Sequence, residues 1–195
     1  HPDNPEFAAA KAAGVPMLTR AELLGQIMRN YDTPIAVSGT HGKTTTTSML
    51  SHILMAADCD PTISVGGILP SIGGNIRVGH SETFLTEACE YTNSFLSFFP
   101  KIGIILNMDA DHLDFFKDID DIRHSFREFA RLLPTDGMLI INADTPKYDY
   151  VTEGLGCKIV TYALENQSVA DYTAANITYD EFDHPSFLSL IHISE

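Results

Sequence analysis

Short apolar runs alternate with amphipathic segments along most of the chain from Pro34 onward. Short apolar runs are typical of buried strands, and apolar positions at helical spacing are typical of helices that cover a sheet. This alternation predicts an α/β fold with a mainly parallel sheet flanked by helices. The expected strands are 35–38, 62–65, 83–86, 102–106 and 138–141.

Two segments between these strands have apolar residues on one helical face. They cover residues 43–57 and 119–133, and both are predicted to be helices that pack on the sheet. Beyond Gly156, residues 158–162 and 172–179 have a β-like composition, but periodicity does not give the order of the strands. The apolar faces consist of Met49, Leu50, Ile53 and Leu54 in the first helix and Ile122, Phe126, Phe129 and Leu133 in the second.

Two further helix signatures precede this pattern. Residues 4–14 begin with an asparagine cap and a proline and end with a glycine, which predicts a short helix. A capping box over residues 19–22 opens a second helix, which is expected to end near Tyr31. Residues 1–33 are interpreted as the tail of a preceding domain and a connector. The apolar positions of the second helix are Leu23, Leu24, Ile27 and Met28.

Composition and charge narrow the classes of partner. The chain has 195 residues, 44% of them hydrophobic, enough for the core of one domain or of one domain and part of another. A net charge of −14 without any basic run argues against a nucleic-acid partner. No signal peptide or long apolar stretch is present, so a cytoplasmic location is expected. Cys59, Cys89 and Cys157 lack metal-ligand spacing and are expected to be reduced thiols.

The apolar run ending at Ser38 leads into Gly-Thr-His-Gly-Lys-Thr, residues 39–44, and then into a predicted helix. Glycines let several backbone N–H groups face one anion, Lys43 neutralises phosphate oxygens, and the Thr44 hydroxyl can bind magnesium. The order strand, loop, helix therefore predicts a loop that binds nucleotide phosphates. The general pattern G-x-x-x-x-G-K-[ST] has a glycine where Val37 stands, so a capping turn is the alternative.

Acidic residues and a histidine follow two other predicted strands at their carboxyl ends, where open α/β sheets bind ligands. Glu87 closes one strand and Glu90 follows it, while His112 lies in the acidic segment 107–114 after the next. A triphosphate needs a cation, so Glu87 and His112 are candidate metal ligands. The alternatives are helix capping by Glu87, a solvated first-turn position for Glu90, and a solvated or core position for His112.

Two glycine pairs, at 66–67 and 73–74, precede Asn75 and Arg77. Glycine permits a close approach of the backbone, and arginine can bind an anion through two N–H groups. Asn75 and Arg77 are therefore candidate substrate contacts, and Glu90 is a third. A glycine-rich surface turn with a solvated arginine is equally consistent with the sequence.

Three motifs together, in this order, resemble the central domain of the Mur ligases. The His41 form of the loop most resembles the branch that adds L-alanine to UDP-N-acetylmuramate. The resemblance extends over residues 3–180 and implies a P-loop-containing Mur ligase central domain, with a remnant of the N-terminal domain before it. The motifs are the loop 39–44 with the threonines after it, Thr-Glu-Ala-Cys-Glu at 86–90, and Asn-Met-Asp-Ala-Asp-His-Leu-Asp at 107–114.

The resemblance also implies a reaction in peptidoglycan precursor synthesis. ATP phosphorylates the muramyl carboxylate, and the L-alanine amine attacks the acyl phosphate to form an amide. ATP and Mg²⁺ are the implied cofactors, and UDP-N-acetylmuramate and L-alanine the implied substrates. Lys43 would hold the β and γ phosphates and Thr44 a first magnesium ion, while Glu87 and His112 would bind a second metal. The implied nucleotide-binding residues are Gly39, Thr40, His41, Gly42, Lys43, Thr44 and Thr45.

The same resemblance divides the chain into three parts. Residues 1–33 would end an N-terminal UDP-binding domain and include a connector, and residues 34–187 would form an incomplete central ATP-binding domain. Residues 188–195 do not resemble the expected continuation and are interpreted as a non-native tail. The N- and C-terminal domains of the same enzyme would then be missing, and the fragment is expected to be inactive alone.

Other interpretations stay open at this point. A murein-recycling ligase, which joins a peptide to the same nucleotide, has a similar loop. A nucleotide-binding module without ligase activity would follow if the chain acts alone, because the reaction needs both substrates held together.

The family often has Glu-Ala-Asp-Glu-Ser-Asp where residues 87–92 read Glu-Ala-Cys-Glu-Tyr-Thr. Ser125-Phe126-Arg127 lacks the metal-bridging lysine of several relatives, as does the alanine-adding branch.

Overall fold

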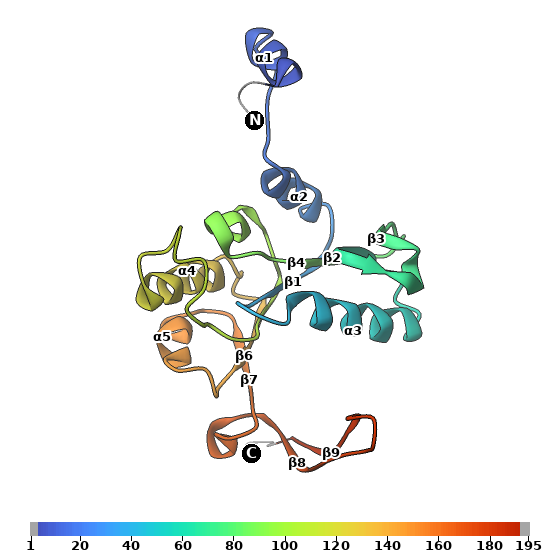
Figure 1. The fold of residues 1–195 in the computed structure, drawn as a ribbon, viewed down its shortest axis with the longest axis vertical. Coiled ribbons are helices and arrows are strands. Elements are labelled where there is room, and N and C mark those ends of the chain that lie inside the picture. Colours follow the sequence, from blue (N-terminus) through green and yellow to red (C-terminus); the bar gives the residue numbers. More distant parts are fainter. Residues whose placement is uncertain (1–3, 192–195) are drawn as a thin grey trace.

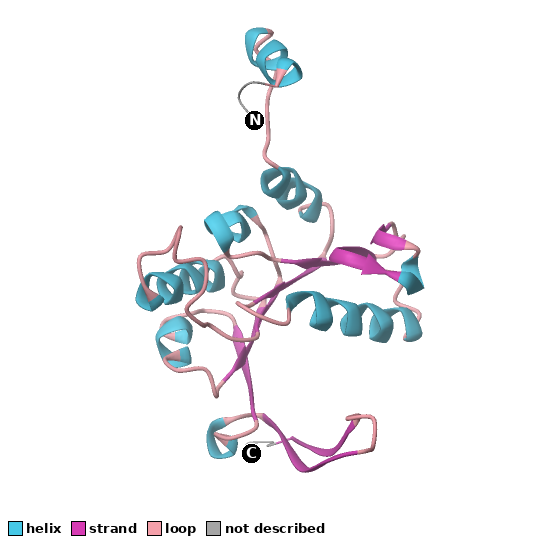
Figure 2. Ribbon diagram, in the orientation of Figure 1, coloured by secondary structure: helices cyan, strands magenta, loops and turns pink. Residues whose placement is uncertain are grey.

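A computed structural model describes residues 4–191 and contains one sheet of nine strands (Figure 1). Helices and short 3₁₀ segments connect the strands (Figure 2). The strands are β1 (Thr33–Ser38), β2 (Thr62–Leu69), β3 (Gly74–Arg77), β4 (Thr83–Glu87), β5 (Ile102–Ile105), β6 (Met138–Asn142), β7 (Lys158–Ala163), β8 (Tyr172–Tyr179) and β9 (Pro185–Ile191). The helices are α1 (Pro5–Ala12), α2 (Arg20–Met28), α3 (Lys43–Ala56), α4 (Ile119–Arg131) and α5 (Tyr148–Thr152), and the 3₁₀ segments are η1 (Pro70–Ile72), η2 (Tyr91–Ser97) and η3 (Gln167–Val169).

The strand order is β3-β2-β4-β1-β5-β6-β7-β8-β9. Neighbours from β2 to β8 pair in parallel, and only the outer pairs β2·β3 and β8·β9 of the described sheet are antiparallel. The predicted mainly parallel α/β fold is thus confirmed. The chain passes from β4 across β1 to β5, so the strand order reverses beside β1. In open α/β sheets ligands bind at the carboxyl ends of the strands near such a reversal.

Both faces of the central strands are covered. Successive residues of a strand point to opposite faces, so Ile35 and Val37 join one apolar cluster and Ala36 joins another. Leu50 and Leu54 of α3 pack against the first cluster, whereas aromatic residues of α4 belong to the second. Strands buried on both faces have continuous apolar sequences, which is why their positions are predictable from the sequence.

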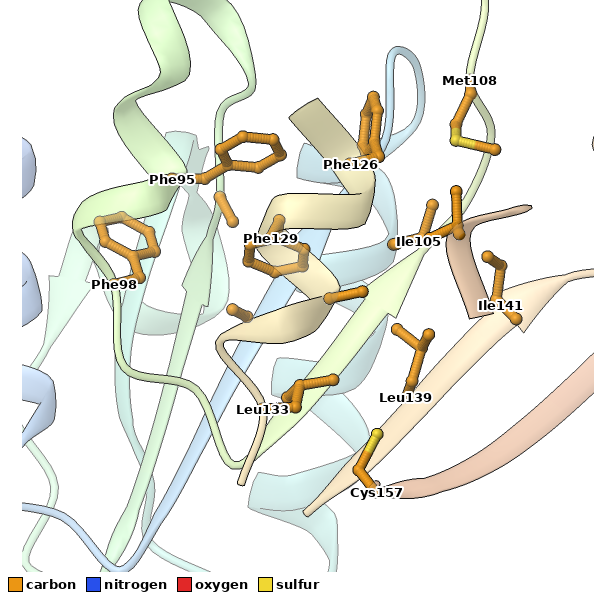
Figure 3. Packing of buried hydrophobic residues seen from close by; sticks show 14 of the residues in the cluster. Phe95, Phe98, Ile105, Met108, Phe126, Phe129, Leu133, Leu139, Ile141 and Cys157 are labelled. Atoms are coloured by element: carbon orange, nitrogen blue, oxygen red, sulfur yellow. The ribbon is translucent and has the colours of Figure 1, made fainter. Parts of the chain in front are cut away.

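The larger cluster centres on phenylalanines from η2 and α4 (Figure 3). The ring of Phe95 stacks on Phe129 with centroids 4.8 Å apart and meets the edge of Phe126 at 5.5 Å. Ile122, Phe126 and Phe129 are buried, as the helical spacing of 119–133 predicts. Each such side chain stabilises the fold by about 1.5–3 kcal/mol through burial alone.

The predicted apolar faces of two other helices are partly wrong. Met49 and Ile53 of α3 are each 60% exposed, while Thr47 and Ser51 are fully buried. Small side chains let α3 lie close to the sheet, and the Ser51 hydroxyl donates to the Thr47 carbonyl at 2.7 Å. In α2 the same error affects Leu23 and Ile27, which are exposed. Apolar side chains beside the true packing face satisfy the same spacing rule, so periodicity alone does not separate them.

The two N-terminal helices differ in their contact with the rest. α1 begins after an Asn4 cap, has no buried residue, and lies away from the sheet (Figure 1). α2 begins with the predicted capping box of Thr19 and Glu22 and ends at Met28, before the expected Tyr31. Gly25 of α2 touches the backbone of η2 so closely that a Cβ there would lie 2.0 Å from the carbonyl oxygen of Ser97. α2 is therefore fitted directly onto η2.

Several elements were not predicted, namely β3, β9, α5 and the 3₁₀ segments. β3 and β9 are the two edge strands of the described sheet, and each depends on antiparallel pairing with a neighbour that local sequence does not reveal. Residues 188–191 of the interpreted tail lie in β9, and residues 192–195 lie outside the described residues. The division of the chain at 33 and 187 stays a prediction.

Two expectations from composition concern cysteines and membranes. Cys59, Cys89 and Cys157 are free thiols, and burial raises the pKa of Cys157. Cys89 is exposed between Glu87 and Glu90. Across residues 4–191, no helix combines the length and the apolar character that a bilayer crossing requires.

Candidate functional site

The loop between β1 and α3 depends on two glycines in unusual conformations. Gly39 has a φ of 142° and Gly42, the N-cap of α3, has a φ of 81°. Both values lie in the region that favours glycine. A Cβ at Gly39 would also lie 2.9 Å from Cβ of Leu106. The predicted order of strand, glycine loop and helix is confirmed, and the N-terminus of a 14-residue helix opens onto the loop.

The segment after β5 holds the loop in place. The Asn107 side chain accepts from the His41 backbone N–H at 2.8 Å and donates to the His41 carbonyl at 3.1 Å. The Thr40 hydroxyl accepts from the Asp109 backbone N–H at 2.9 Å. Sequence reasoning gave Asn107 no role of its own. The signal in the sequence was its position directly after the predicted strand 102–106. In the structure Ile105 pairs with Ser38, so Asn107 follows next to the loop.

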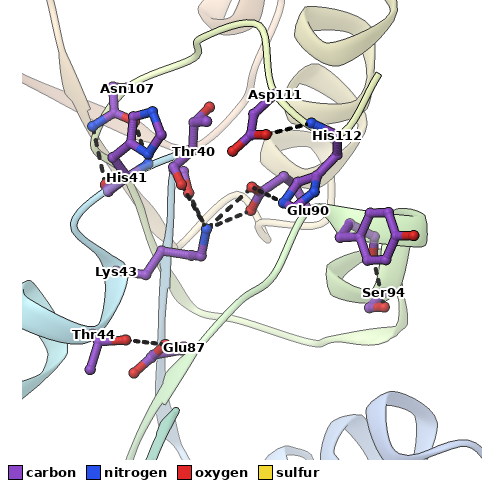
Figure 4. Close-up of polar contacts among 12 residues, drawn as sticks. Thr40, His41, Lys43, Thr44, Glu87, Glu90, Ser94, Asn107, Asp111 and His112 are labelled. Carbon is purple, nitrogen blue, oxygen red and sulfur yellow. Dashed lines mark hydrogen bonds and ion pairs between the residues drawn. The ribbon is translucent and has the colours of Figure 1, made fainter. Parts of the chain in front are cut away.

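Lys43 lies folded back over this loop (Figure 4). Its Nζ donates to the carbonyls of Gly39 at 2.6 Å and Thr40 at 3.1 Å. It also lies 2.9 and 3.2 Å from the two carboxylate oxygens of Glu90. The Glu90 side chain is only 2% exposed, so the alternative of a solvated position is wrong: the carboxylate faces Lys43. Its contact with a substrate stays a prediction.

Glu87 extends from the end of β4 toward the first turn of α3. Its Oε2 accepts from the Thr44 hydroxyl at 3.0 Å, and its Oε1 accepts from the Gly66 backbone N–H at 2.6 Å. A side chain at Gly66 would begin 2.7 Å from Oε2 of Glu87, so the glycine is required for this approach. A hydroxyl and a carboxylate this close together offer the hard oxygen ligands that Mg²⁺ prefers. Thr44 and Glu87 thus fit a magnesium ion.

His112 has a different set of neighbours from Glu87. Its backbone has a φ of 52°, its ring packs on Tyr91 with centroids 4.6 Å apart, and its Nε2 lies 3.9 Å from Oε1 of Glu90. The Tyr91 hydroxyl donates to Asp114 at 2.8 Å. This hydrogen bond and the negative charge of Asp114 raise the pKa of Tyr91. Within residues 4–191, no three acidic, histidine or cysteine side chains are placed to hold one metal ion. Shared metal binding by Glu87 and His112 stays a prediction.

Arg77 lies away from the glycine loop, and its contact with a substrate stays a prediction. Arg77 pairs in register with Ile63, which puts it near the amino end of β2, opposite the loop. Its guanidinium donates to the Asp60 carboxylate at 2.5 Å and to the Pro61 carbonyl at 2.6 Å. Arg77 therefore closes the β2·β3 hairpin. Asn75, two residues earlier in β3, is exposed, and its substrate contact stays a prediction.

Comparison with known proteins identifies the family of the chain. A family model described as the Mur ligase middle domain matches residues 37–194. The UDP-N-acetylmuramate–L-alanine ligase of Agathobacter rectalis is 63% identical over 190 residues, which cover 97% of this chain and 41% of that protein. The chain therefore spans less than half the length of this relative.

Solved structures show the same fold. The UDP-N-acetylmuramate-alanine ligase of Thermotoga maritima matches with a TM-score of 0.76 and 27% identity, over 92% of this chain and 39% of that chain. The UDP-N-acetylmuramate:L-alanyl-gamma-D-glutamyl-meso-diaminopimelate ligase from Neisseria meningitides matches with a TM-score of 0.81 and 23% identity, over 97% of this chain and 61% of that chain. Because the family match includes the glycine loop and nearly all of the sheet, the chain belongs to the Mur ligase family and contains its middle domain.

Proposed function

We propose that this chain is the ATP-binding part of a UDP-N-acetylmuramate–L-alanine ligase. The relative with 63% identity is named UDP-N-acetylmuramate–L-alanine ligase, and this chain covers 41% of its length. The proposed substrates are therefore those of the whole protein. The observation that supports ATP binding best is the contact of Thr44 with Glu87 beside the glycine loop, at 3.0 Å. It puts oxygen ligands for a cation next to backbone N–H groups that suit phosphates.

Each group of the loop has a separate task in this proposal. The backbone N–H groups of residues 39–44 and the N-terminus of α3 orient the phosphates, and Lys43 supplies a positive charge that moves with its flexible side chain. Thr44 and Glu87 would hold Mg²⁺, which neutralises phosphate charge when bound. Transfer of a phosphoryl group to a carboxylate needs positioning and charge neutralisation rather than a protein nucleophile.

The remaining parts of the reaction involve groups beyond the loop. The muramyl carboxylate attacks the γ phosphorus of ATP and ADP leaves. The L-alanine amine then attacks the acyl carbon, and phosphate leaves as the amide forms. His112, whose side chain is 36% exposed, is proposed to bind a second cation together with Glu87 near the acyl phosphate. Both substrates must be held together for this step, which calls for the whole protein.

Lys43→Ala tests the binding of ATP to the loop. Isothermal titration calorimetry with Mg-ATP is expected to show at least about 100-fold weaker binding, because a charge that contacts the phosphates is lost. Lys101→Ala is the matched control. Lys101 lies directly before β5, away from the loop, and forms an ion pair with Asp136. Thermal melting of both variants separates weaker binding from unfolding. Equal ATP affinity in Lys43→Ala and the unmodified chain would show that the loop does not bind ATP.

The incoming amine is tested on the full-length protein by phosphate release. UDP-N-acetylmuramate and ATP are supplied with either L-alanine or the tripeptide L-alanyl-γ-D-glutamyl-meso-diaminopimelate. L-Alanine is expected to give the higher kcat/KM. A preference for the tripeptide would assign the protein to the murein-recycling type of ligase and overturn the proposed amine.

A further inference from the structure

The ammonium group of Lys43 has no proton left for a ligand. An ammonium group has three N–H donors. Two loop carbonyls, of Gly39 and Thr40, and the Glu90 carboxylate all accept from it at 2.6 to 3.2 Å. A phosphate can therefore bind Lys43 only if at least one of these partners releases it.

Glu90 is the partner whose release changes the charge of the site most. Its side chain is 2% exposed and that of Lys43 is 16% exposed, so the pair is shielded from water. A buried carboxylate without a cation is strongly unfavourable. The nearest other cation-forming group is His112, whose Nε2 is 3.9 Å from Glu90. Lys43 is thus the main compensation for the charge of Glu90.

Resting on the proposed function, we infer that Glu90 is the resting counter-ion of Lys43, a positioning residue with which a nucleotide polyphosphate competes for the ammonium group. Without a nucleotide, Glu90 holds the ammonium group against the loop carbonyls and keeps it beside the phosphate position. An arriving polyphosphate competes with Glu90 for the same ammonium group, and its negative charges also repel this carboxylate. The charge of Glu90 therefore weakens the binding of phosphate-bearing ligands while keeping Lys43 in place.

Glu90→Gln tests this competition, because glutamine keeps the shape and one oxygen acceptor and removes only the charge. Calorimetry on the full chain is expected to show about tenfold tighter binding of Mg-ATP and Mg-ADP, as for the loss of one competing charged hydrogen bond. Adenosine has no phosphate, so its affinity is expected to stay unchanged. A merely structural role of Glu90 would not change the affinity for ATP and ADP while leaving that for adenosine unchanged.

Glu82→Gln is the matched control for net charge. Glu82 is exposed before β4, and its removal also takes one negative charge from the chain's −14. This variant is expected to bind ATP and ADP as the unmodified chain does. Equal tightening in both variants would mean that only the overall charge matters and would overturn the inference.

A second variant keeps the inference testable if Glu90→Gln does not fold. Glu90→Asp keeps the charge but withdraws it from Lys43 by one methylene group, and a smaller gain in ATP affinity is expected. Unchanged or weaker ATP binding in the folded variants, while the unmodified chain binds ATP, would overturn the role of Glu90 alone. Absence of ATP binding in the unmodified chain would overturn the proposed function as well.

Discussion

Asp60 and Glu87 lie at opposite ends of the paired strands β2 and β4, and different partners hold their carboxylates. Asp60 accepts from the guanidinium of Arg77 at 2.5 Å and from the backbone N–H of His80 at 3.0 Å. Glu87 accepts from the Thr44 hydroxyl at 3.0 Å and from the Gly66 backbone N–H at 2.6 Å. One carboxylate has a cation as its partner, and the other has only neutral groups.

This difference separates a structural carboxylate from one that can serve a ligand. The hydrogen bond from Arg77, followed by those from His80, lowers the pKa of Asp60 to about 2. The positive charge of the Arg77 guanidinium compensates the negative charge of this carboxylate within the protein. Among the ion pairs of residues 4–191, none involves Glu87, so its negative charge faces the loop uncompensated. A divalent cation can supply that compensation. The partner of a carboxylate is thus more informative than its presence at a strand end.

The largest expected effect concerns the exchange of each carboxylate for its amide. In the full-length protein, Glu87→Gln is expected to lower kcat/KM for ATP by about 100-fold, as is found for weakened metal sites. Asp60→Asn is the matched control and is expected to leave kcat/KM within about twofold, since surface changes away from a site have small effects. Phosphate release measures both. Comparable losses in the two variants would abolish the distinction between the two ends of the sheet.

A smaller effect is expected from Gly66→Ala, which leaves Glu87 in place but crowds it. The new methyl group would begin 2.7 Å from Oε2 of Glu87 and push the carboxylate away from Thr44. Mg-ATP binding is expected to weaken about tenfold, equivalent to about 1.4 kcal/mol, which is within the usual range for a methyl group forced into close packing. Calorimetry measures it. Gly74→Ala is the control because a Cβ at Gly74 meets nothing within 4 Å, and a loss there of similar size would contradict the explanation.

The smallest expected effect concerns stability at acidic pH. Because the pKa of Asp60 is lowered from 3.8 to about 2, its ion pair stabilises the folded state fully above pH 3.8 and loses this effect as the pH falls toward 2. The melting temperature of the unmodified chain is expected to exceed that of Asp60→Asn by a few degrees at pH 7. The two should converge as the pH falls through 2 and coincide below it. A difference that does not change with pH would assign the effect to packing instead.

The glycine loop was predictable because its signals are local. A buried strand, glycines at the turns and a helix after Lys43 follow one another within a few positions, and each has a backbone reason. The aromatic face of α4 was predictable for the same reason. Neither feature depends on which distant segment lies beside it.

The surroundings of two candidate site residues were not predictable, for one physical reason. The role of Arg77 depends on the antiparallel register of β2 and β3, which puts it beside Asp60 rather than near the loop. The burial of Glu90 depends on Lys43, 47 positions away in the chain. Spacing rules contain no information about such pairings, so the chemistry of a charged residue was predictable only as a set of alternatives.

The close fit of α2 on η2 has a consequence for substitutions outside the site. No methyl group fits between Gly25 and the Ser97 carbonyl, so any residue larger than glycine at position 25 requires α2 and η2 to separate. Glu90 immediately precedes η2 and contacts Lys43. A single glycine in α2 is therefore a packing requirement for the segment that follows the Lys43–Glu90 pair.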